Sequence, residues 1–275
     1  MGTTQKSLIN YENPPVVEVV CGILFESIHN FLAPHIGLLW EKFRPEYPEC
    51  REAPPLTPTI ETFEREPSSR KLKFEISETP PLPRIWFVHE NENGLIQVQR
   101  NRFLYNWRKI RPSDEYPRYY YVIEMFRKQL SQFKSFLQEN NLGEISPLQY
   151  EMTYINHIPQ GDGWDSIKDI GKLFPDFVFR RKRGRFLNEP EAINWRTSFI
   201  LPNQAGRFHV TIQKIRESET NRPILVLNST VRGIGNDKST EGMWEWFDLA
   251  HEWIVYGFAD LTAKEVQKTI WGLKE

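Results

Sequence analysis

The stretch from Leu95 to Trp107, LIQVQRNRFLYNW, has the clearest strand pattern of the chain. An Asn93-Gly94 pair stands just before it, and the apolar run IWFV at 85–88 stands before that pair. Asn-Gly between two apolar runs is a strong hairpin signal, because both central residues of a type I′ turn need positive φ. The sequence therefore predicts a hairpin within 84–107 that forms the centre of a sheet.

The composition is that of a globular protein. The chain has 275 residues, 39% hydrophobic and 26% charged, with a formal net charge of −1. This length suits one large or two modest domains, and the charge disfavours a globally basic nucleic-acid binder. Two cysteines, Cys21 and Cys50, are too few for a disulfide framework or a four-cysteine zinc site.

No targeting or membrane signal stands out. No apolar stretch approaches the ~20 residues that a spanning helix needs. The first residues, MGTTQKSLINYENPP, lack the charged start and apolar core of a secretory signal. We therefore expect a cytoplasmic protein that makes no membrane contact.

Periodicity predicts an alternation of strands and helices. In the first half we expect a strand over 16–27, a helix over 31–43, a proline-rich loop over 50–83 that contains one strand at 71–76, the hairpin, and a long amphipathic helix after Pro117. In the second half we expect a strand over 148–159, a short helix to about 174, strands over 191–201, 206–216 and 222–232, a long helix from about 240 to 260, and a last short helix that begins with a Thr262-x-x-Glu265 capping box.

The two halves repeat the same order of elements, namely strand, helix, three or four antiparallel strands, and long helix. Pro14-x-x-Val17-Glu18 corresponds to Pro147-x-x-Tyr150-Glu151. We therefore predict an α+β fold made by internal duplication of a β-α-β(3-4)-α unit, with an N-terminal arm at 1–13, a first repeat at 14–146, and a second repeat with C-terminal helices at 147–275. Antiparallel sheets with helices on one face are typical of TATA-binding-protein-like or helix-grip-like architectures.

Motifs for catalysis, metal or cofactor binding are missing from the sequence. His251-Glu252 is not followed by the second histidine of HExxH, and Gly233-x-Gly235 lacks the third glycine of the dinucleotide pattern. His251 falls on the apolar stripe of its helix, which favours a core or interface histidine with satisfied hydrogen bonds over a ligand. His157, Asp162 and Asp165 suit either a metal or a capped turn, and the turn is the simpler interpretation. We predict no catalytic residue, no metal and no cofactor.

Two basic stretches keep nucleic-acid binding open as an alternative. RRKRGR places Arg180, Arg181, Lys182, Arg183 and Arg185 in six residues. RNRFLYNWRKIR at 100–111 mixes aromatic rings with cations, as single-strand binders do. Phe103, Tyr105 and Trp107 share one strand face, however, and this favours a buried aromatic face with solvated charges opposite.

Polar side chains that alternate with the core positions form the main candidate site. Such residues would point away from the helices and either offer a surface to a ligand, a nucleic acid or a protein, or simply be solvated. The predicted binding residues are Gln97, Gln99, Asn194, Arg196, Arg207, His209, Thr211 and Gln213.

Short motifs along the chain carry a resemblance. They are the N-terminal run Asn13 to Glu18 followed by Gly22-Ile23 and Phe25, the segment Leu95 to Gln99 with Arg102-Phe103 and Asn106-Trp107, Tyr154 to His157, and Phe258 with Thr262 and Trp271. With these residues the chain resembles, over nearly its full length, a sporadically distributed family of uncharacterised bacterial proteins. The patchy distribution that this resemblance implies suggests mobile genes in conflict or defence loci.

Two functions follow as expectations. The first is a non-enzymatic binding or regulatory component, in a bacterial defence or toxin-control system, with a protein partner encoded nearby or a second copy of the chain. The alternative is a sensor or enzyme for nucleotides or nucleic acid that uses the basic segments.

Overall fold

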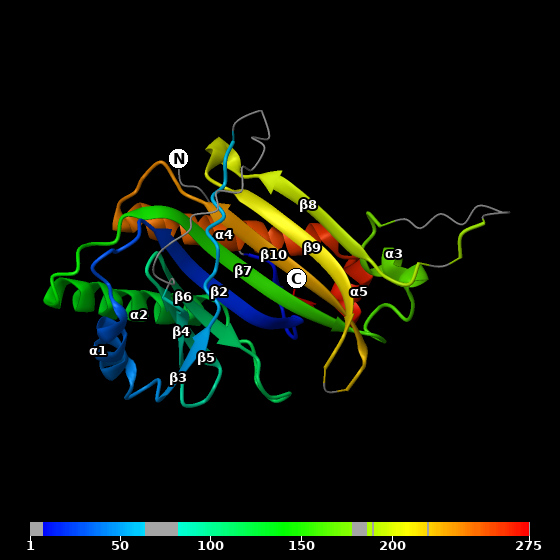
Figure 1. The fold of residues 1–275 in the computed structure, drawn as a ribbon. Helices are drawn as coiled ribbons and strands as arrows, with labels where there is room; N and C mark the ends of the chain where they lie inside the picture. Colours follow the sequence, from blue (N-terminus) through cyan, green and yellow to red (C-terminus); the bar gives the residue numbers. More distant parts are fainter. Residues whose placement is uncertain (1–7, 64–81, 178–185, 189, 219, 275) are drawn as a thin grey trace.

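One curved antiparallel sheet organises the molecule (Figure 1). The computed structural model describes residues 8–63, 82–177, 186–188, 190–218 and 220–274. Within these residues, nine strands hydrogen-bond in the order β3-β4-β5-β6-β2-β7-β10-β9-β8, and every neighbouring pair is antiparallel. The predicted α+β class with antiparallel strands is confirmed.

Strands from both halves of the chain alternate with helices along the sequence. The sheet strands are β2 (Val16–Phe25), β3 (Glu49–Ala53), β4 (Arg84–Val88), β5 (Gly94–Gln99), β6 (Arg102–Arg108), β7 (Pro147–Pro159), β8 (Asn194–Ile200), β9 (Arg207–Arg216) and β10 (Pro223–Gly233). A separate two-stranded pair joins β1 (Asn10–Tyr11) to β11 (Leu273–Lys274).

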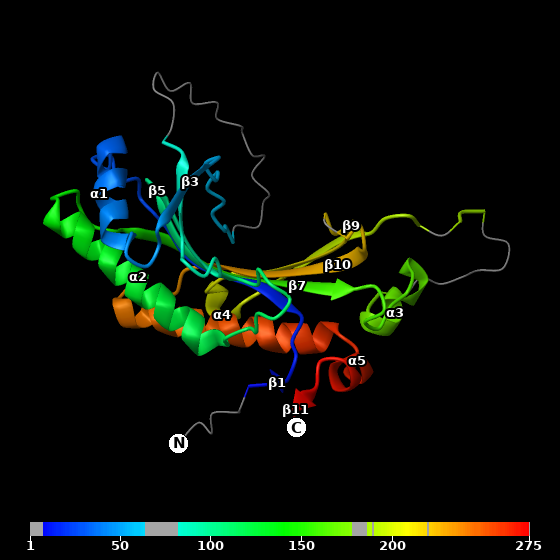
Figure 2. The same cartoon turned by 90° about the horizontal axis from the view of Figure 1, so that it is seen from below.

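The described residues form five α-helices, and the two long ones lie side by side under the same face of the sheet (Figure 2). The helices are α1 (Ala33–Phe43), α2 (Tyr119–Glu139), α3 (Ile170–Leu173), α4 (Thr240–Leu261) and α5 (Lys264–Thr269). Helix α2 packs on the strands of the first half, and α4 packs on β7, β9 and β10. Both helices present a stripe of buried aromatic and aliphatic side chains to the sheet, as their periodicity predicts.

The core lies between the sheet and these two helices, and it is rich in aromatic rings. Phe103 stacks on Phe133 of α2 at 4.9 Å between ring centroids, and Phe247 of α4 meets Phe126 of α2 at 5.3 Å. Tyr105 and Trp107 are buried on the same strand face as Phe103. The prediction that the aromatic face of this strand belongs to the core is confirmed.

The stretch from Leu95 to Trp107 forms most of two neighbouring strands, β5 and β6, joined at Arg100-Asn101. Strands β4 and β5 pair as predicted, but the Asn93-Gly94 turn is wrong. Gly94 belongs to β5, and Glu92 is the residue in this connection with positive φ, at 65°. Five residues therefore join the strands, and the Asn93 side chain donates to the Arg108 carbonyl and the Asp114 carboxylate.

The proline-rich segment contains a strand that its composition hides. Residues 49–53 form β3 at one edge of the sheet. Their sequence, ECREA, has no apolar alternation, and the strand pairs through its backbone with β4. The strand predicted at 71–76 lies outside the described residues. The rest of the segment up to Phe63 has no regular structure and crosses the sheet.

The second half follows its predicted elements closely. The strands predicted over 191–201, 206–216 and 222–232 are β8, β9 and β10, and Ser239 caps α4 by accepting a hydrogen bond from the Gly242 amide. The capping box at Thr262 is wrong, because Ala263 is the N-cap of α5 and the Thr262 hydroxyl donates to the Phe258 carbonyl. This hydroxyl therefore closes the end of α4 instead of starting α5.

Among the described helices, none has both the length and the apolar character required to cross a membrane.

Candidate binding face of the sheet

The sheet face opposite α2 and α4 carries most of the predicted binding residues, and we call it the outer face. Strand register places its side chains in rows that run across the strands. One row runs from Gln97 through Leu104 and Gly22 to Glu151, and continues through Arg232 and Arg207. Because successive side chains of a strand alternate between faces, all of these point away from the helices.

An extended segment of the same chain lies across this face. We call residues 56–63, Leu56 to Phe63, the strap. The Gln99 side chain binds both backbone groups of Leu56, since its Oε1 accepts from the amide at 2.9 Å and its Nε2 donates to the carbonyl at 3.1 Å. Gln149 repeats the pattern, accepting from the Glu61 amide and donating to the Thr59 carbonyl, both at 2.8 Å. Two glutamines thus hold the strap through its backbone.

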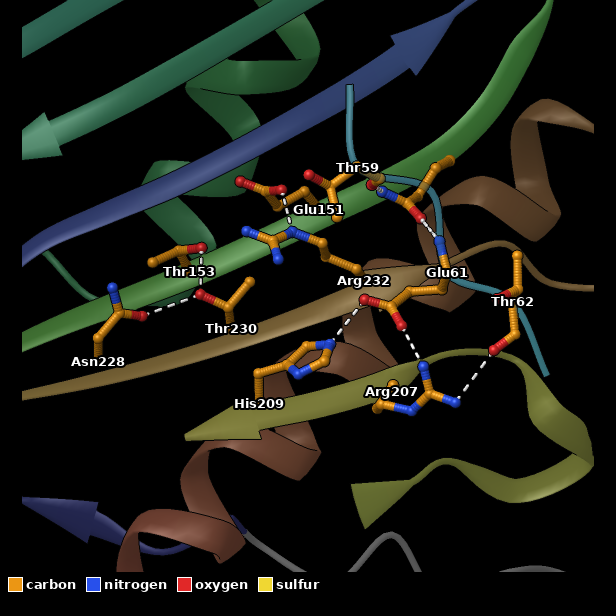
Figure 3. A network of polar contacts seen from close by, with 11 residues as sticks. Thr59, Glu61, Thr62, Glu151, Thr153, Arg207, His209, Asn228, Thr230 and Arg232 are labelled. Atoms are coloured by element: carbon orange, nitrogen blue, oxygen red, sulfur yellow. Dashed lines mark hydrogen bonds and ion pairs between the residues drawn. The ribbon is translucent and has the colours of Figure 1, made fainter. Parts of the chain in front are cut away.

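The strap ends in a charged contact with β9 (Figure 3). One oxygen of the Glu61 carboxylate accepts a hydrogen bond from the Arg207 guanidinium. The other oxygen lies 2.6 Å from Nε2 of His209. Arg207 also donates to the Thr62 carbonyl at 3.1 Å and places its guanidinium over the Phe63 ring. The Glu61 side chain is only 7% exposed, so this contact is shielded from solvent.

The environment of Glu61 favours its ionised form. Burial raises its pKa, but the hydrogen bonds and charges of His209 and Arg207 together hold the pKa below its ordinary value. A carboxylate whose pKa is lower in the folded than in the unfolded state stabilises the fold above the unfolded pKa, and this contribution disappears as pH falls through the folded pKa. The strap is therefore bound most firmly near neutral pH.

We expect the strap to loosen in acid before the sheet does. Hydrogen exchange should show the protection factors of the Leu56 and Glu61 amides falling as pH drops below about 4.5, while amides within β7 keep theirs. In Glu61→Gln the strap amides should be less protected at pH 7 and should show little further change in acid. Equal protection in both proteins at pH 7 would contradict the role of the Glu61 carboxylate.

Among the described residues beside the strap, the guanidinium groups of Arg84, Arg102 and Arg232 share one carboxylate, that of Glu151. Arg102 is only 9% exposed, and its Nε has no hydrogen-bond partner within the described part of the chain. Burial lowers the pKa of Arg102, as do the charges of Arg232 and Arg84, while Glu151 raises it. Glu151 is already bound by the Arg232 Nε at 2.6 Å. This part of the outer face therefore has an excess of positive charge that favours anionic groups.

Two further sets of polar side chains on the outer face are joined by hydrogen bonds. Arg84 donates to Gln97, Gln97 to Asn106 and Asn106 to Glu18, at 2.9, 2.7 and 2.6 Å. Across the β7–β10 pair, the hydroxyls of Thr153 and Thr230 lie 2.8 Å apart, and Thr230 also donates to Asn228 (Figure 3). Such networks fix side-chain directions, so the surface under the strap is preorganised.

The eight predicted binding residues thus divide into three groups. Gln99, Arg207 and His209 hold the strap, whereas Gln97 is buried within the hydrogen-bond chain. Register places the others on the outer face of the two strands at one edge of the sheet, and they make no hydrogen bond through their side chains to another described residue; they are Asn194, Arg196, Thr211 and Gln213.

Several residues that complete the outer face were not predicted. Gln149, Glu151 and Thr153 alternate along β7, and Arg232 follows the same rule on β10. This period-2 alternation was available in the sequence. The strap itself was not predictable in this way, because Glu61 lies 146 positions from Arg207 and no local pattern connects them.

Metal and nucleic-acid predictions remain as expectations. Among the described residues, no group of three or more histidine, cysteine, aspartate or glutamate side chains is arranged to hold a metal ion. Near Asp165, Ser166 caps the short helix and Asp169 binds back to the Ser166 amide at 3.2 Å. The basic residues predicted for nucleic acid, from Arg180 to Arg185, lie outside the described residues.

Comparison with known proteins adds no relative: no protein-family model, curated protein or solved structure matches the chain.

Proposed function

We propose that this protein is a non-enzymatic binding component whose outer face takes an extended polypeptide segment that carries a carboxylate. The support comes from the way the outer face holds the strap, through both backbone groups of an extended chain and one acidic side chain. In this proposal the strap occupies the partner's place when no partner is bound.

The two kinds of contact give the proposed site its selectivity. Gln99 and Gln149 each offer an acceptor to an amide and a donor to a carbonyl, so they recognise an extended backbone whatever its side chains. Arg207 and His209 then require a carboxylate, and charge-assisted hydrogen bonds are roughly twice as strong as neutral ones. The excess positive charge around Arg102 favours a segment with further acidic groups.

The fold and the biological setting belong to the same proposal. The order of elements in 14–146 and 147–275 supports an internal duplication with a TATA-binding-protein-like or helix-grip-like arrangement. The short motifs of the family resemblance support a place in a bacterial defence or toxin-control system. A regulatory binding protein in such a system would take a segment of its partner when the strap is released.

A peptide with the strap sequence tests the proposal. An attached segment competes at an effective concentration on the order of millimolar, so the free peptide PPLTPTIETF (residues 54–63) should bind the wild-type protein weakly. In full-length Glu61→Ala the attached strap is weakened, and fluorescence anisotropy should show at least ~10-fold tighter binding of the labelled peptide, equivalent to about 1.4 kcal/mol.

Two variants make the test specific. Adding Arg207→Ala to Glu61→Ala should remove the gain, and the peptide with Gln in place of Glu61 should bind about 10-fold more weakly than the original. Glu252→Ala, on the exposed side of α4, is the matched control and should behave like the wild type. If the two peptides bind Glu61→Ala equally well, recognition of an acidic segment is ruled out.

A further inference from the structure

A cavity of about 520 Å³ lies on the helix side of the sheet, away from the strap. It is bounded by the N-terminal segment around β1, by the residues that lead into α2, by the end of β7, and by α4. Ligand pockets in proteins typically span ~300–1,000 Å³ and are mostly apolar with a few polar groups. We call this cavity the tyrosine pocket after the side chains that line it, which include Tyr11, Tyr116, Tyr119, Tyr120 and Tyr154.

Aromatic rings with fixed orientations form its walls. The His251 imidazole stacks on Tyr119 with ring centroids 3.9 Å apart and an interplanar angle of 6°. Tyr154 lies 6.0 Å from His251, and its hydroxyl is 2.8 Å from that of Tyr116. Phe258 meets Tyr11 edge to face at 5.4 Å. Flat rings bind well to such walls, because offset-stacked and edge-to-face contacts are the favoured aromatic geometries.

Two polar groups in the wall have bonding capacity left over. Burial lowers the pKa of His251 to about 4, so its ring is neutral at pH 7, with one donor and one acceptor nitrogen. Within the described part of the chain, neither nitrogen has a hydrogen-bond partner. Asn156, 3% exposed, donates to the Leu227 carbonyl at 3.3 Å, and its side-chain oxygen accepts no hydrogen bond from another described residue.

Arg118 gives the pocket its charge. Its guanidinium donates to Asn10 Oδ1 and to the Tyr11 and Glu12 carbonyls at 3.3, 2.9 and 3.1 Å, and it contacts no carboxylate among the described residues. Three neutral acceptors do not cancel its charge, and a guanidinium has five N–H groups. The backbone of Arg118 has a φ of 73°, and residues other than glycine and asparagine rarely adopt this conformation. Residues whose strained backbone is maintained by the surrounding structure cluster at binding sites.

We propose that the tyrosine pocket binds a small planar aromatic acid, with the ring against the Tyr154, His251 and Phe258 side chains and the acid group toward Arg118. The size of the cavity suits one or two fused rings. The cation of Arg118 disfavours a positively charged ligand, and the neutral imidazole of His251 offers a hydrogen bond to a ring substituent.

Three naphthalene compounds of the same shape test this proposal by isothermal titration calorimetry at pH 7 on the full-length protein. We expect 2-naphthoate to bind with one site per chain, 2-naphthol to bind about 10-fold more weakly, and 2-naphthylmethylammonium to bind more weakly still. Arg118→Gln should remove the preference for the acid over the alcohol, because the difference depends on its charge.

A pair of neighbouring variants locates the site. Val255→Trp fills the pocket from α4 and should abolish binding of all three compounds, whereas Tyr256→Trp, one residue along but outside the pocket lining, should leave binding unchanged. Circular dichroism melting curves of both variants control for folding. Binding of 2-naphthoate that Val255→Trp does not weaken, equal affinity for the three compounds, or no binding by any of them would each overturn the proposal. None of these outcomes bears on the strap peptide.

Discussion

Gly233→Ala should destabilise the protein by about 3 kcal/mol or more. This is the largest effect that we expect from a substitution that removes no side-chain contact. A Cβ on Gly233 would lie 2.2 Å from the Ala205 carbonyl oxygen and 2.3 Å from the Gly206 Cα. All of these are backbone atoms at the end of β10 and the start of β9, so no side chain can rotate to make room. The two strand ends must separate instead.

Thermal unfolding followed by circular dichroism measures this effect. At roughly 2–4 °C per kcal/mol for a chain of this size, Tm should fall by about 6–12 °C. Gly37→Ala is the matched control, because nothing lies within 4 Å of a Cβ at this helical position, and it should raise stability by roughly 0.5–1 kcal/mol. Arg232 and Arg207 are register partners beside Gly233, so the variant should also bind the strap less firmly. A Tm within 1 °C of wild type would refute the close approach.

The second large effect is a loss of stability in mild acid that comes from His251. Its pKa is about 4 in the folded protein, against an ordinary value of 6.5, because burial disfavours the charged ring. As pH falls from about 6.5 to 4, the unfolded chain takes up a proton that the folded chain does not, so the free energy of unfolding decreases. The full shift corresponds to about 3 kcal/mol at 1.36 kcal/mol per pKa unit, and partial exposure of the ring reduces our expectation to about 2 kcal/mol.

Replacing His251 with phenylalanine isolates this contribution. The substitution keeps a flat ring against Tyr119 and removes the titrating group. Urea unfolding at pH 7 and at pH 4.5 should show a difference in pH dependence of about 2 kcal/mol between wild type and His251→Phe. His29→Asn, at an exposed position, should change nothing. If wild type and His251→Phe lose stability in parallel, the ring titrates normally in the folded state.

Much of the fold was predictable because local patterns specify it. The alternation of Phe208, Val210 and Ile212 marks β9, and the stripe from Phe126 to Leu137 marks the buried side of α2. Predictions failed where tertiary partners decide the structure. Strand β3 is made by backbone pairing with β4, and the Asn93 side chain is used by Asp114 instead of a tight turn.

The candidate site was predictable only in part for the same reason. Outer-face residues such as Arg207 and His209 follow from period-2 alternation once β9 is recognised. The contact of these two residues with Glu61 could not be predicted, because a proline-rich segment without periodicity gives no sign of where it lies. The tyrosine pocket also escaped prediction. His251 lies on the apolar stripe of α4 as predicted, but its ring nitrogens have no hydrogen-bond partner among the described residues. The cavity beside it is assembled from four separate parts of the chain.

The pairing of β2 with β7 has a consequence for the growing chain on the ribosome. Val19 lies opposite Tyr154, and 122 positions separate the end of β2 at Phe25 from the start of β7 at Pro147. At synthesis rates of ~5–20 residues per second, at least one edge of β2 stays unpaired for roughly 6–25 s after the strand emerges. A strand that is central in the finished protein is therefore, for that interval, an open hydrogen-bonding edge of a nascent chain. Slower translation of the second half should increase aggregation of the first.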